Sequence, residues 1–172
     1  MFRKAILQDV DKITEIYESI HTEEEAGRTT IGWIRNIYPT RQTAVDSVLK
    51  GDMFVEEING QIVAAAKINQ EQVPEYADAT WQYDALPEQV MVLHTLVVDP
   101  KEKGKGYGTK FVKYYEEYAL FHGCPYLRMD TNEKNSQART LYKKLGYEEV
   151  STVSCIFNGI PDVRLICLEK KV

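Results

Sequence analysis

The residues that could do chemistry begin with a glycine-rich stretch, Lys103-Gly104-Lys105-Gly106-Tyr107-Gly108. It follows an apolar run from Val90 to Val98, which predicts a buried strand that ends at Asp99-Pro100, because proline lacks the N–H that strand pairing needs. A helical pattern begins near Gly108. A strand, a glycine-rich turn and a helix N-terminus in this order leave backbone N–H groups free, and the helix dipole adds partial positive charge. The stretch is therefore predicted to bind phosphate.

The charge around this stretch also favours an anionic ligand. Five lysines and one acid, Glu102, lie between Lys101 and Lys113, whereas the whole chain has a formal net charge of -5. The spacing of the three glycines is GxGxG, not the GxGxxG of a dinucleotide fold, and no GxxxxGK[ST] occurs. A dehydrogenase or a nucleotide kinase is therefore not expected. A surface loop whose glycines only turn the chain is the alternative.

Two segments resemble motifs of the GCN5-related N-acetyltransferases, the GNAT family. The segment from Leu96 to Gly108 is similar to motif A, [Gln/Arg]-x-x-Gly-x-[Gly/Ala], which holds the pyrophosphate of acetyl-CoA in that family. The segment from Asn135 to Tyr147, Asn-x-x-Ala-x-x-Leu-Tyr-x-x-x-Gly-Tyr, is similar to the next motif. The two lie in the family's order and separation. Lys103 departs from the pattern, because lysine keeps a donor but lacks the planar fork of arginine.

The resemblance implies a site for acetyl-CoA as cosubstrate. Backbone N–H groups of the loop would bind the pyrophosphate, and a bulge in the central strand would free backbone groups for the pantetheine arm and the thioester oxygen. Asn135 would cap the next helix or bond the pantetheine arm. Tyr142 would protonate the leaving thiolate as general acid, with a core tyrosine as the alternative. The residues expected at this site are Leu96, Val97, Val98, Lys103, Gly104, Lys105, Gly106, Tyr107, Gly108, Thr109, Asn135 and Tyr142.

His94 is the candidate general base. By the two-residue period of a strand we expect it to share a face with Val92 and Leu96, and histidine titrates near neutral pH. His-x-Leu-x-Val resembles the central strand of the arylalkylamine acetyltransferases, in which a pair of histidines relays protons through water. Val92 stands in the place of the second histidine, which is also the place of the glutamate in histone acetyltransferases. A structural core histidine and water-mediated deprotonation without one essential base are the alternatives.

The acceptor is expected to be a primary amine, and a cationic one in one interpretation. Residues 69–89 form a long connection that contains no Lys or Arg and five acids, interleaved with Tyr76, Trp81 and Tyr83. If this connection and Glu23-Glu24-Glu25 border the acceptor, their carboxylates would attract an ammonium, and Trp81 or Tyr83 could stack on it. Solvated surface is the alternative. Polyamines, an amino-acid-like metabolite, an aminoglycoside and a protein N-terminus are all compatible.

The composition predicts one soluble domain over residues 1–172. Hydrophobic residues make up 44% of the chain and charged residues 27%, and a pI near 5.3 argues against a nucleic-acid binder. Three cysteines without a CxxC and three scattered histidines give no disulfide framework and no zinc ligand set, so no metal is expected. No signal peptide pattern and no apolar run of about 20 residues occurs. A cytoplasmic protein is predicted. Homodimers are common in the GNAT family, but no segment specifies an interface.

The remaining pattern predicts the elements that position these residues. Helices are expected after Asp9 and Thr40, near Gly108 and around Ala138, each with apolar residues at helical spacing. Asn59-Gly60 and Asn158-Gly159 predict hairpin turns. Strands are expected at residues 2–5, 53–58, 61–68, 90–98, 126–131, 147–157 and 163–169. The order β-α-α-β-β-β-α-β-α-β-β matches the GNAT acyl-CoA N-acyltransferase fold, an α/β (α+β) fold whose mixed central sheet of about seven strands is flanked by four helices.

Two functions follow from the resemblance. The first is an acetyl-CoA-dependent N-acetyltransferase that moves the acetyl group directly to a primary amine of a small molecule or a protein N-terminus. Direct transfer is expected because Cys124, Cys155 and Cys167 lie outside the motifs. The alternative is a non-catalytic acyl-CoA-binding sensor or regulatory module of the same fold. Tyr142 favours the enzyme, and the missing carboxylate at Val92 favours the module.

Overall fold

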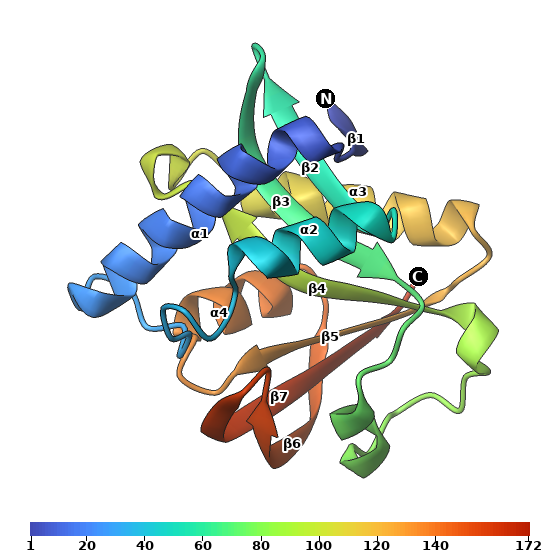
Figure 1. Cartoon of the computed structure of the whole chain (residues 1–172). Helices are drawn as coiled ribbons and strands as arrows, with labels where there is room; N and C mark the ends of the chain where they lie inside the picture. Colours follow the sequence, from blue (N-terminus) through green and yellow to red (C-terminus); the bar gives the residue numbers. More distant parts are fainter.

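A seven-stranded mixed sheet forms the centre of the computed structural model, which describes all residues from 1 to 172 (Figure 1). The strands lie in the order β1-β2-β3-β4-β5-β7-β6. All neighbouring strands are antiparallel except β4 and β5, which run parallel. The strands are β1 Phe2–Lys4, β2 Met53–Ile58, β3 Gln61–Asn69, β4 Val90–Val98, β5 Tyr126–Asn132, β6 Glu148–Phe157 and β7 Ile160–Lys171.

Four α-helices cover the two faces of this sheet. On one face α1 and α2 bury Ile13, Ile16 and Ala44 against β2, β3 and β4. On the other face α3 and α4 bury residues such as Phe111 and Tyr142 against the middle strands. None of the helices has both the length and the hydropathy that crossing a membrane requires. The helices are α1 Val10–Glu25, α2 Arg41–Leu49, α3 Tyr107–Phe121 and α4 Ser136–Lys144.

The predicted order of elements and the two hairpin turns are confirmed. Asn59 and Gly60, and likewise Asn158 and Gly159, have positive φ, as the two central residues of a type I′ turn require. The last strand begins at Ile160, three residues before the predicted start. Its pairing with β6 continues to the turn, and its first residues pair with β6 but not with β5. Pro161, which lacks an N–H, therefore interrupts no hydrogen bond to β5.

The parallel pair β4–β5 separates halfway along β4. Val90 to Leu93 pair with Tyr126 to Met129, and beyond Leu93 the two strands share no pairing. The paired half of β4 is fully buried, whereas His94, Thr95 and Leu96 are only half-buried. The sheet is therefore split in its middle, and the split lies where the chain leads from β4 into the glycine-rich loop. This split positions the site.

Candidate active site

A β-bulge at Thr95 changes the direction of β4. His94 pairs with Lys67 and Val97 pairs with Ala65, so three steps along β4 oppose two steps along β3. Thr95 has φ +53°, a left-handed conformation that is uncommon for a β-branched residue. One extra residue in a strand bends it and increases its twist. The bulge therefore accounts for the separation of β4 from β5, as the family resemblance implied.

The bulge also corrects the predicted face of His94. Lys67 and Ala65 lie two residues apart in β3, so their partners His94 and Val97 share the face covered by α1 and α2. Leu96 packs with the opposite cluster, beneath α3 and α4. The prediction that His94 shares a face with Leu96 is wrong, because the extra residue shifts the alternation by one.

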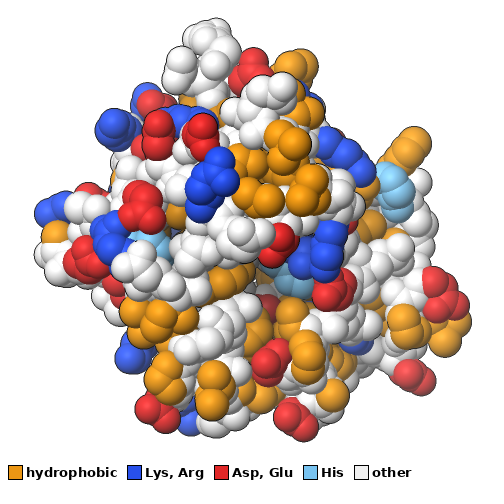
Figure 2. Space-filling view, in the orientation of Figure 1, with side chains coloured by type: hydrophobic (Ala, Val, Ile, Leu, Met, Phe, Trp, Pro, Cys, Tyr) orange, Lys and Arg blue, Asp and Glu red, His pale blue; other side chains and the backbone are white.

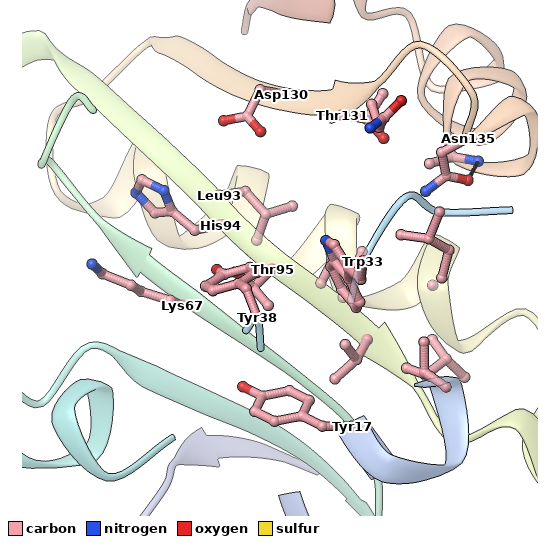
Figure 3. A pocket seen from close by; sticks show the side chains of 18 of the residues that line it. Tyr17, Trp33, Tyr38, Lys67, Leu93, His94, Thr95, Asp130, Thr131 and Asn135 are labelled. Carbon is pink, nitrogen blue, oxygen red and sulfur yellow. Dashed lines mark hydrogen bonds between the residues drawn. The ribbon is translucent and has the colours of Figure 1, made fainter. Parts of the chain in front are cut away.

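A cavity of about 930 Å³ occupies the split between β4 and β5. It is lined by β4 from Leu93 to Val98, by Asp130, Thr131 and Asn132 of β5, by the start of α3 and by α4 (Figure 3). Residues of α1, α2 and the loop between them close its other side. A hollow is visible near the centre of the face that carries α1 and α2 (Figure 2). The cavity therefore connects the glycine-rich loop with the opened part of the sheet.

The glycine-rich loop presents free backbone donors at one end of this cavity. Gly104 and Gly106 have φ of +83° and +80°, which glycine adopts without strain. Gly106 is the residue that precedes the first turn of α3. The loop donors that make no hydrogen bond within the chain are the N–H groups of Gly104, Gly106, Tyr107, Gly108 and Thr109. Free donors at a helix N-terminus form an anion site.

Tyr142 of α4 and Asp130 of β5 both line the cavity. Tyr142 comes from α4, is 7% exposed and makes no side-chain hydrogen bond within the chain. Burial, followed by the nearby charge of Asp130, raises the pKa of Tyr142 above its usual value. Burial also raises the pKa of Asp130 to about 7, although the Tyr76 hydroxyl donates a hydrogen bond of 2.8 Å that lowers it. Tyr142 therefore retains its proton at neutral pH, whereas Asp130 gains and loses a proton near that pH.

Comparison with known proteins gives the family. The chain matches the Acetyltransferase (GNAT) family over residues 11–147. It belongs to the GNAT family. It is 30% identical over 100 residues to an uncharacterized N-acetyltransferase of Methanocaldococcus jannaschii, covering 58% of this chain and 40% of that protein. It is 32% identical over 71 residues to the thialysine N-epsilon-acetyltransferase of Bos taurus, covering 41% of this chain and 42% of that protein. The chain thus matches about two fifths of the length of these curated relatives.

Solved structures share the GNAT fold over the whole chain. An acetyltransferase of the GNAT family from Streptococcus agalactiae superposes with a TM-score of 0.84 at 23% identity, covering 100% of this chain and 95% of that one. A ribosomal-protein-alanine N-acetyltransferase from Brucella melitensis gives a TM-score of 0.72 at 16% identity, covering 100% and 99%. The predicted fold class is confirmed.

Within this GNAT fold, most of the predicted acetyl-CoA residues line the cavity. Lys105 does not: its Nζ lies 2.7 Å from Glu102 Oε2, and its N–H donates to the Glu102 carbonyl at 3.4 Å. Asn135 caps α4, since its Oδ1 accepts from the N–H of Ala138 at 3.1 Å. Of the two roles predicted for Asn135, the structure shows the cap. The predicted residues that line the cavity are Leu96, Val97, Val98, Lys103, Gly104, Gly106, Tyr107, Gly108, Thr109, Asn135 and Tyr142.

His94 lies at the edge of the GNAT cavity, where its protonation is disfavoured. Its Nε2 is 3.0 Å from Asn69 Oδ1. Burial and the positive charge of Lys67 lower the pKa of His94 to about 4, against a smaller opposing effect of Glu71. The imidazole is therefore neutral at physiological pH, and it is a weak proton acceptor. Near neutral pH the lower pKa makes the His94 imidazole a weaker proton acceptor than the Asp130 carboxylate.

Asp130 is the residue that the sequence analysis missed. Leu127 and Met129 point to the α3 side of β5, so the alternation places Arg128 and Asp130 on the other face. Arg128 has a carboxylate partner, Glu169, at 3.0 Å, whereas the hydrogen-bond partner of Asp130 is the neutral hydroxyl of Tyr76. The signal available in the sequence was a carboxylate inside a predicted strand, next to the apolar Met129.

The long connection between β3 and β4 does not supply the aromatic residues of the cavity. The Trp81 ring lies against the Arg128 guanidinium at 4.1 Å, and the Tyr83 ring faces Tyr126 and Lys171. Neither ring lines the cavity. The interpretation in which Trp81 or Tyr83 stacks on an acceptor gains no support, because both rings pack on groups of the chain itself.

Aromatic groups come instead from α1 and from the α1–α2 loop (residues 26–40). Tyr17, Trp33 and Tyr38 line the cavity and are seen together in Figure 3. Tyr17 is 1% exposed, and its hydroxyl has no hydrogen-bond partner in the chain. Buried polar groups are nearly always paired, so an unpaired hydroxyl that faces a cavity is available to a bound molecule.

Proposed function

We propose that this GNAT protein is an acetyl-CoA-dependent N-acetyltransferase, with residues 1–172 acting as one domain, that moves the acetyl group directly to a primary amine. The observation that carries the proposal is the placement of Asp130 and Tyr142 in one cavity that ends at a loop of free backbone donors. Asp130 can take a proton near neutral pH, and Tyr142 can give one.

The residues present fit acetyl-CoA. Free N–H groups from Gly104 to Thr109 would bind its pyrophosphate, and Lys103, which lines the cavity without an ion pair, would add charge. The backbone from Leu96 to Val98 has no partner on the β5 side and would pair with the pantetheine arm. The thioester supplies an activated acetyl group when it is bound.

The chain's own residues would handle the protons of the transfer. The Asp130 carboxylate would take a proton from the acceptor ammonium, which frees the nitrogen lone pair to form the N–C bond. As the C–S bond breaks, the Tyr142 hydroxyl would give its proton to the leaving sulfur. Its raised pKa keeps Tyr142 protonated until that step. The nitrogen loses its second proton when the amide forms, and that proton would restore the Tyr142 hydroxyl through water. Asp130 would release the first proton to solvent, so both residues return to their starting states.

The acceptor class is a primary amine that carries positive charge before reaction. Asp46 and Asp130 line the cavity, as do the rings of Trp33 and Tyr38. Carboxylates attract an ammonium, and aromatic rings stabilise it through cation–π contact. The thialysine and ribosomal-protein-alanine acetyltransferases among the similar proteins are named for amines on small and on macromolecular acceptors. Both kinds of acceptor belong in the test.

The test starts with calorimetry. Acetyl-CoA should bind with micromolar affinity and lose most of that affinity when Gly106 is replaced by Val, because a β-branched residue is strained at φ +80°. A panel of polyamines, amino acids, aminoglycosides and peptides with free N-termini is then screened by thiol release. Asp130→Asn and Tyr142→Phe should each lower kcat at least about 100-fold with little change in acetyl-CoA affinity.

Two outcomes would contradict the proposal. Absence of acetyl-CoA binding would reduce the glycine-rich loop to a turn. Tight binding without turnover on any amine would favour the non-catalytic sensor of acyl-CoA. Full turnover in Tyr142→Phe would remove Tyr142 from its role as general acid and leave the rest of the proposal standing.

A further inference from the structure

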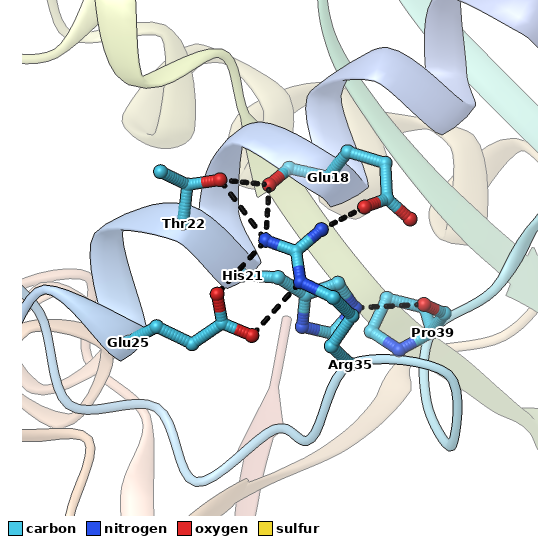
Figure 4. Close-up of polar contacts among 6 residues, drawn as sticks. All are labelled: Glu18, His21, Thr22, Glu25, Arg35 and Pro39. Carbon is cyan, nitrogen blue, oxygen red and sulfur yellow. Dashed lines mark hydrogen bonds and ion pairs between the residues drawn. The ribbon is translucent and has the colours of Figure 1, made fainter.

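The α1–α2 loop is fastened along its length to α1. The Glu24 carboxylate accepts hydrogen bonds from the N–H groups of Ile31 at 2.6 Å and Gly32 at 3.0 Å. The Arg35 guanidinium bonds Glu25 at 2.8 Å and also contacts Glu18 (Figure 4). Glu23, Glu24 and Glu25 are partly or largely exposed, as the surface interpretation predicted, and they also hold this loop.

The far side of the loop touches the walls of the cavity. A Cβ atom on Gly32 would lie 2.4 Å from Asn132 Nδ2, at the end of β5. Ile37 lies against the turn between β6 and β7, where a Cβ atom on Gly159 would be 3.3 Å from Ile37 Cγ2. The loop thus spans the cavity from α1 to both strands beyond the split. It has little freedom to shift without breaking these contacts.

Tyr38 links this fixed loop to the bulge in β4. Its hydroxyl is hydrogen-bonded to the Thr95 hydroxyl, which has no other side-chain partner. Thr95 is the residue with φ +53°. A β-branched residue in this conformation persists only where its surroundings hold it. The bulge sets the direction of Leu96 to Val98, the backbone that would face the thioester.

We propose that Tyr38 is a positioning residue, whose hydroxyl holds Thr95 and thereby fixes the bulge for acetyl transfer. This inference rests on the proposed function, because the bulge matters to catalysis only if the backbone after it faces the thioester. Tyr38 is expected to act mainly on the transfer step, because the free N–H groups that would bind the pyrophosphate of acetyl-CoA lie in the glycine-rich loop and not in the bulge. Its effect passes through Thr95, so the two hydroxyl groups form one unit.

The kinetic test is a double-mutant cycle. Tyr38→Phe and Thr95→Val each remove one hydroxyl with little change in shape, and each should lower kcat about tenfold while KM for acetyl-CoA changes less than about twofold. The double variant should be no slower than either single variant, because both remove the same bond. Thr95→Ser keeps the hydroxyl and should retain most of the wild-type kcat. Additive losses, or a loss confined to KM of the amine, would overturn the proposal.

A second measurement does not depend on activity. Hydrogen exchange of the free protein should quicken in the peptide covering residues 94–98 of Tyr38→Phe and Thr95→Val, and should stay unchanged in α3. Tyr118→Phe is the matched control, since Tyr118 lies outside the cavity and its hydroxyl makes no hydrogen bond. Unchanged exchange at residues 94–98 would overturn the link between Tyr38 and the bulge. Faster exchange in a protein that acetylates no amine would instead reject the proposed function and keep the link.

Discussion

Two connections of this GNAT domain look alike in sequence and differ in what their side chains contact. The β3–β4 connection (residues 70–89) and the α1–α2 loop both carry aromatic residues, and acids accompany both. In the connection, Trp81 packs on Arg128 and Tyr83 packs on Lys171. In the loop, Trp33 and Tyr38 face the cavity, while carboxylates of α1 hold the backbone behind them. Aromatic residues that already have cations of the chain as partners are not available to a substrate.

The largest effect on stability is expected from breaking the Arg128–Glu169 ion pair, which holds the β3–β4 connection. Arg128 and Glu169 are 6% and 0% exposed, and Glu169 also accepts the N–H groups of Gln82 and Tyr83. Arg128→Met leaves a buried carboxylate without its cation, which should cost about 3–5 kcal/mol in the free energy of unfolding, measured with urea. The double variant Arg128→Met/Glu169→Leu should recover much of this loss. If Arg128→Met were as stable as the wild type, the Arg128–Glu169 ion pair would contribute nothing to stability.

A matched pair of tryptophans separates the two connections directly. Trp81→Ala should lower the free energy of unfolding by about 2–3 kcal/mol and leave KM for the amine unchanged, because its ring packs on Arg128. Trp33→Ala should cost less stability and lower kcat/KM for the amine about tenfold, because its ring lines the cavity. Urea titration and steady-state kinetics measure the two effects. The comparison fails if the two variants show the same pattern.

Tyr76 of the β3–β4 connection contacts Asp130, and the pH dependence of the reaction should report this contact. Because the pKa of Asp130 is about 7, kcat/KM should rise with pH and level off above that value. The Tyr76 hydroxyl bonds the carboxylate at 2.8 Å and favours its charged form. Tyr76→Phe should therefore move the rise about half a unit to higher pH. Tyr83→Phe, from the same connection but away from Asp130, should leave the profile unchanged. An unmoved profile in Tyr76→Phe would separate the pH dependence from Asp130.

The same shift has a consequence for stability. The folded-state pKa of Asp130 lies above its ordinary value of 3.8, so the folded protein holds a proton that the unfolded chain releases. The stability from this group is complete below pH 3.8 and is lost as pH rises through 7. Asparagine cannot ionise, so the stability of Asp130→Asn minus that of the wild type should be larger at pH 8 than at pH 5. Thermal unfolding at the two pH values measures the difference.

The smallest effect is expected from the ion pairs on the outside of the α1–α2 loop. Arg35, Glu18 and Glu25 are 29%, 48% and 56% exposed, so water and salt screen their attraction. Arg35→Gln should lower kcat/KM for the amine by less than about threefold, and added salt should shrink the difference from the wild type. A loss as large as that of Trp33→Ala would mean that the loop depends on this cation and not on the Glu24 hydrogen bonds.

The order of elements could be predicted because it depends on local signals. Asn-Gly pairs set both hairpins, and helical spacing of apolar residues set the four helices. The bulge could not be read from the sequence, because Thr95 continues an apolar strand pattern. Its conformation depends on how His94 and Val97 on either side pair with β3 and on the Tyr38 hydroxyl of the α1–α2 loop. Asp130 escaped for a related reason. Its pKa depends on burial and on the hydroxyl of Tyr76, a residue 54 positions away along the chain.

The split in the sheet also changes where the protein is open to strand pairing. An ordinary open sheet has two edges, and each can recruit a strand from another molecule. Here the outer edges are β1, which is three residues long, and β6, while the separated ends of β4 and β5 add two more that face one another inside the molecule. The α1–α2 loop spans the opening between them. The unpaired backbone groups of these inner edges therefore face the cavity and not a neighbouring molecule.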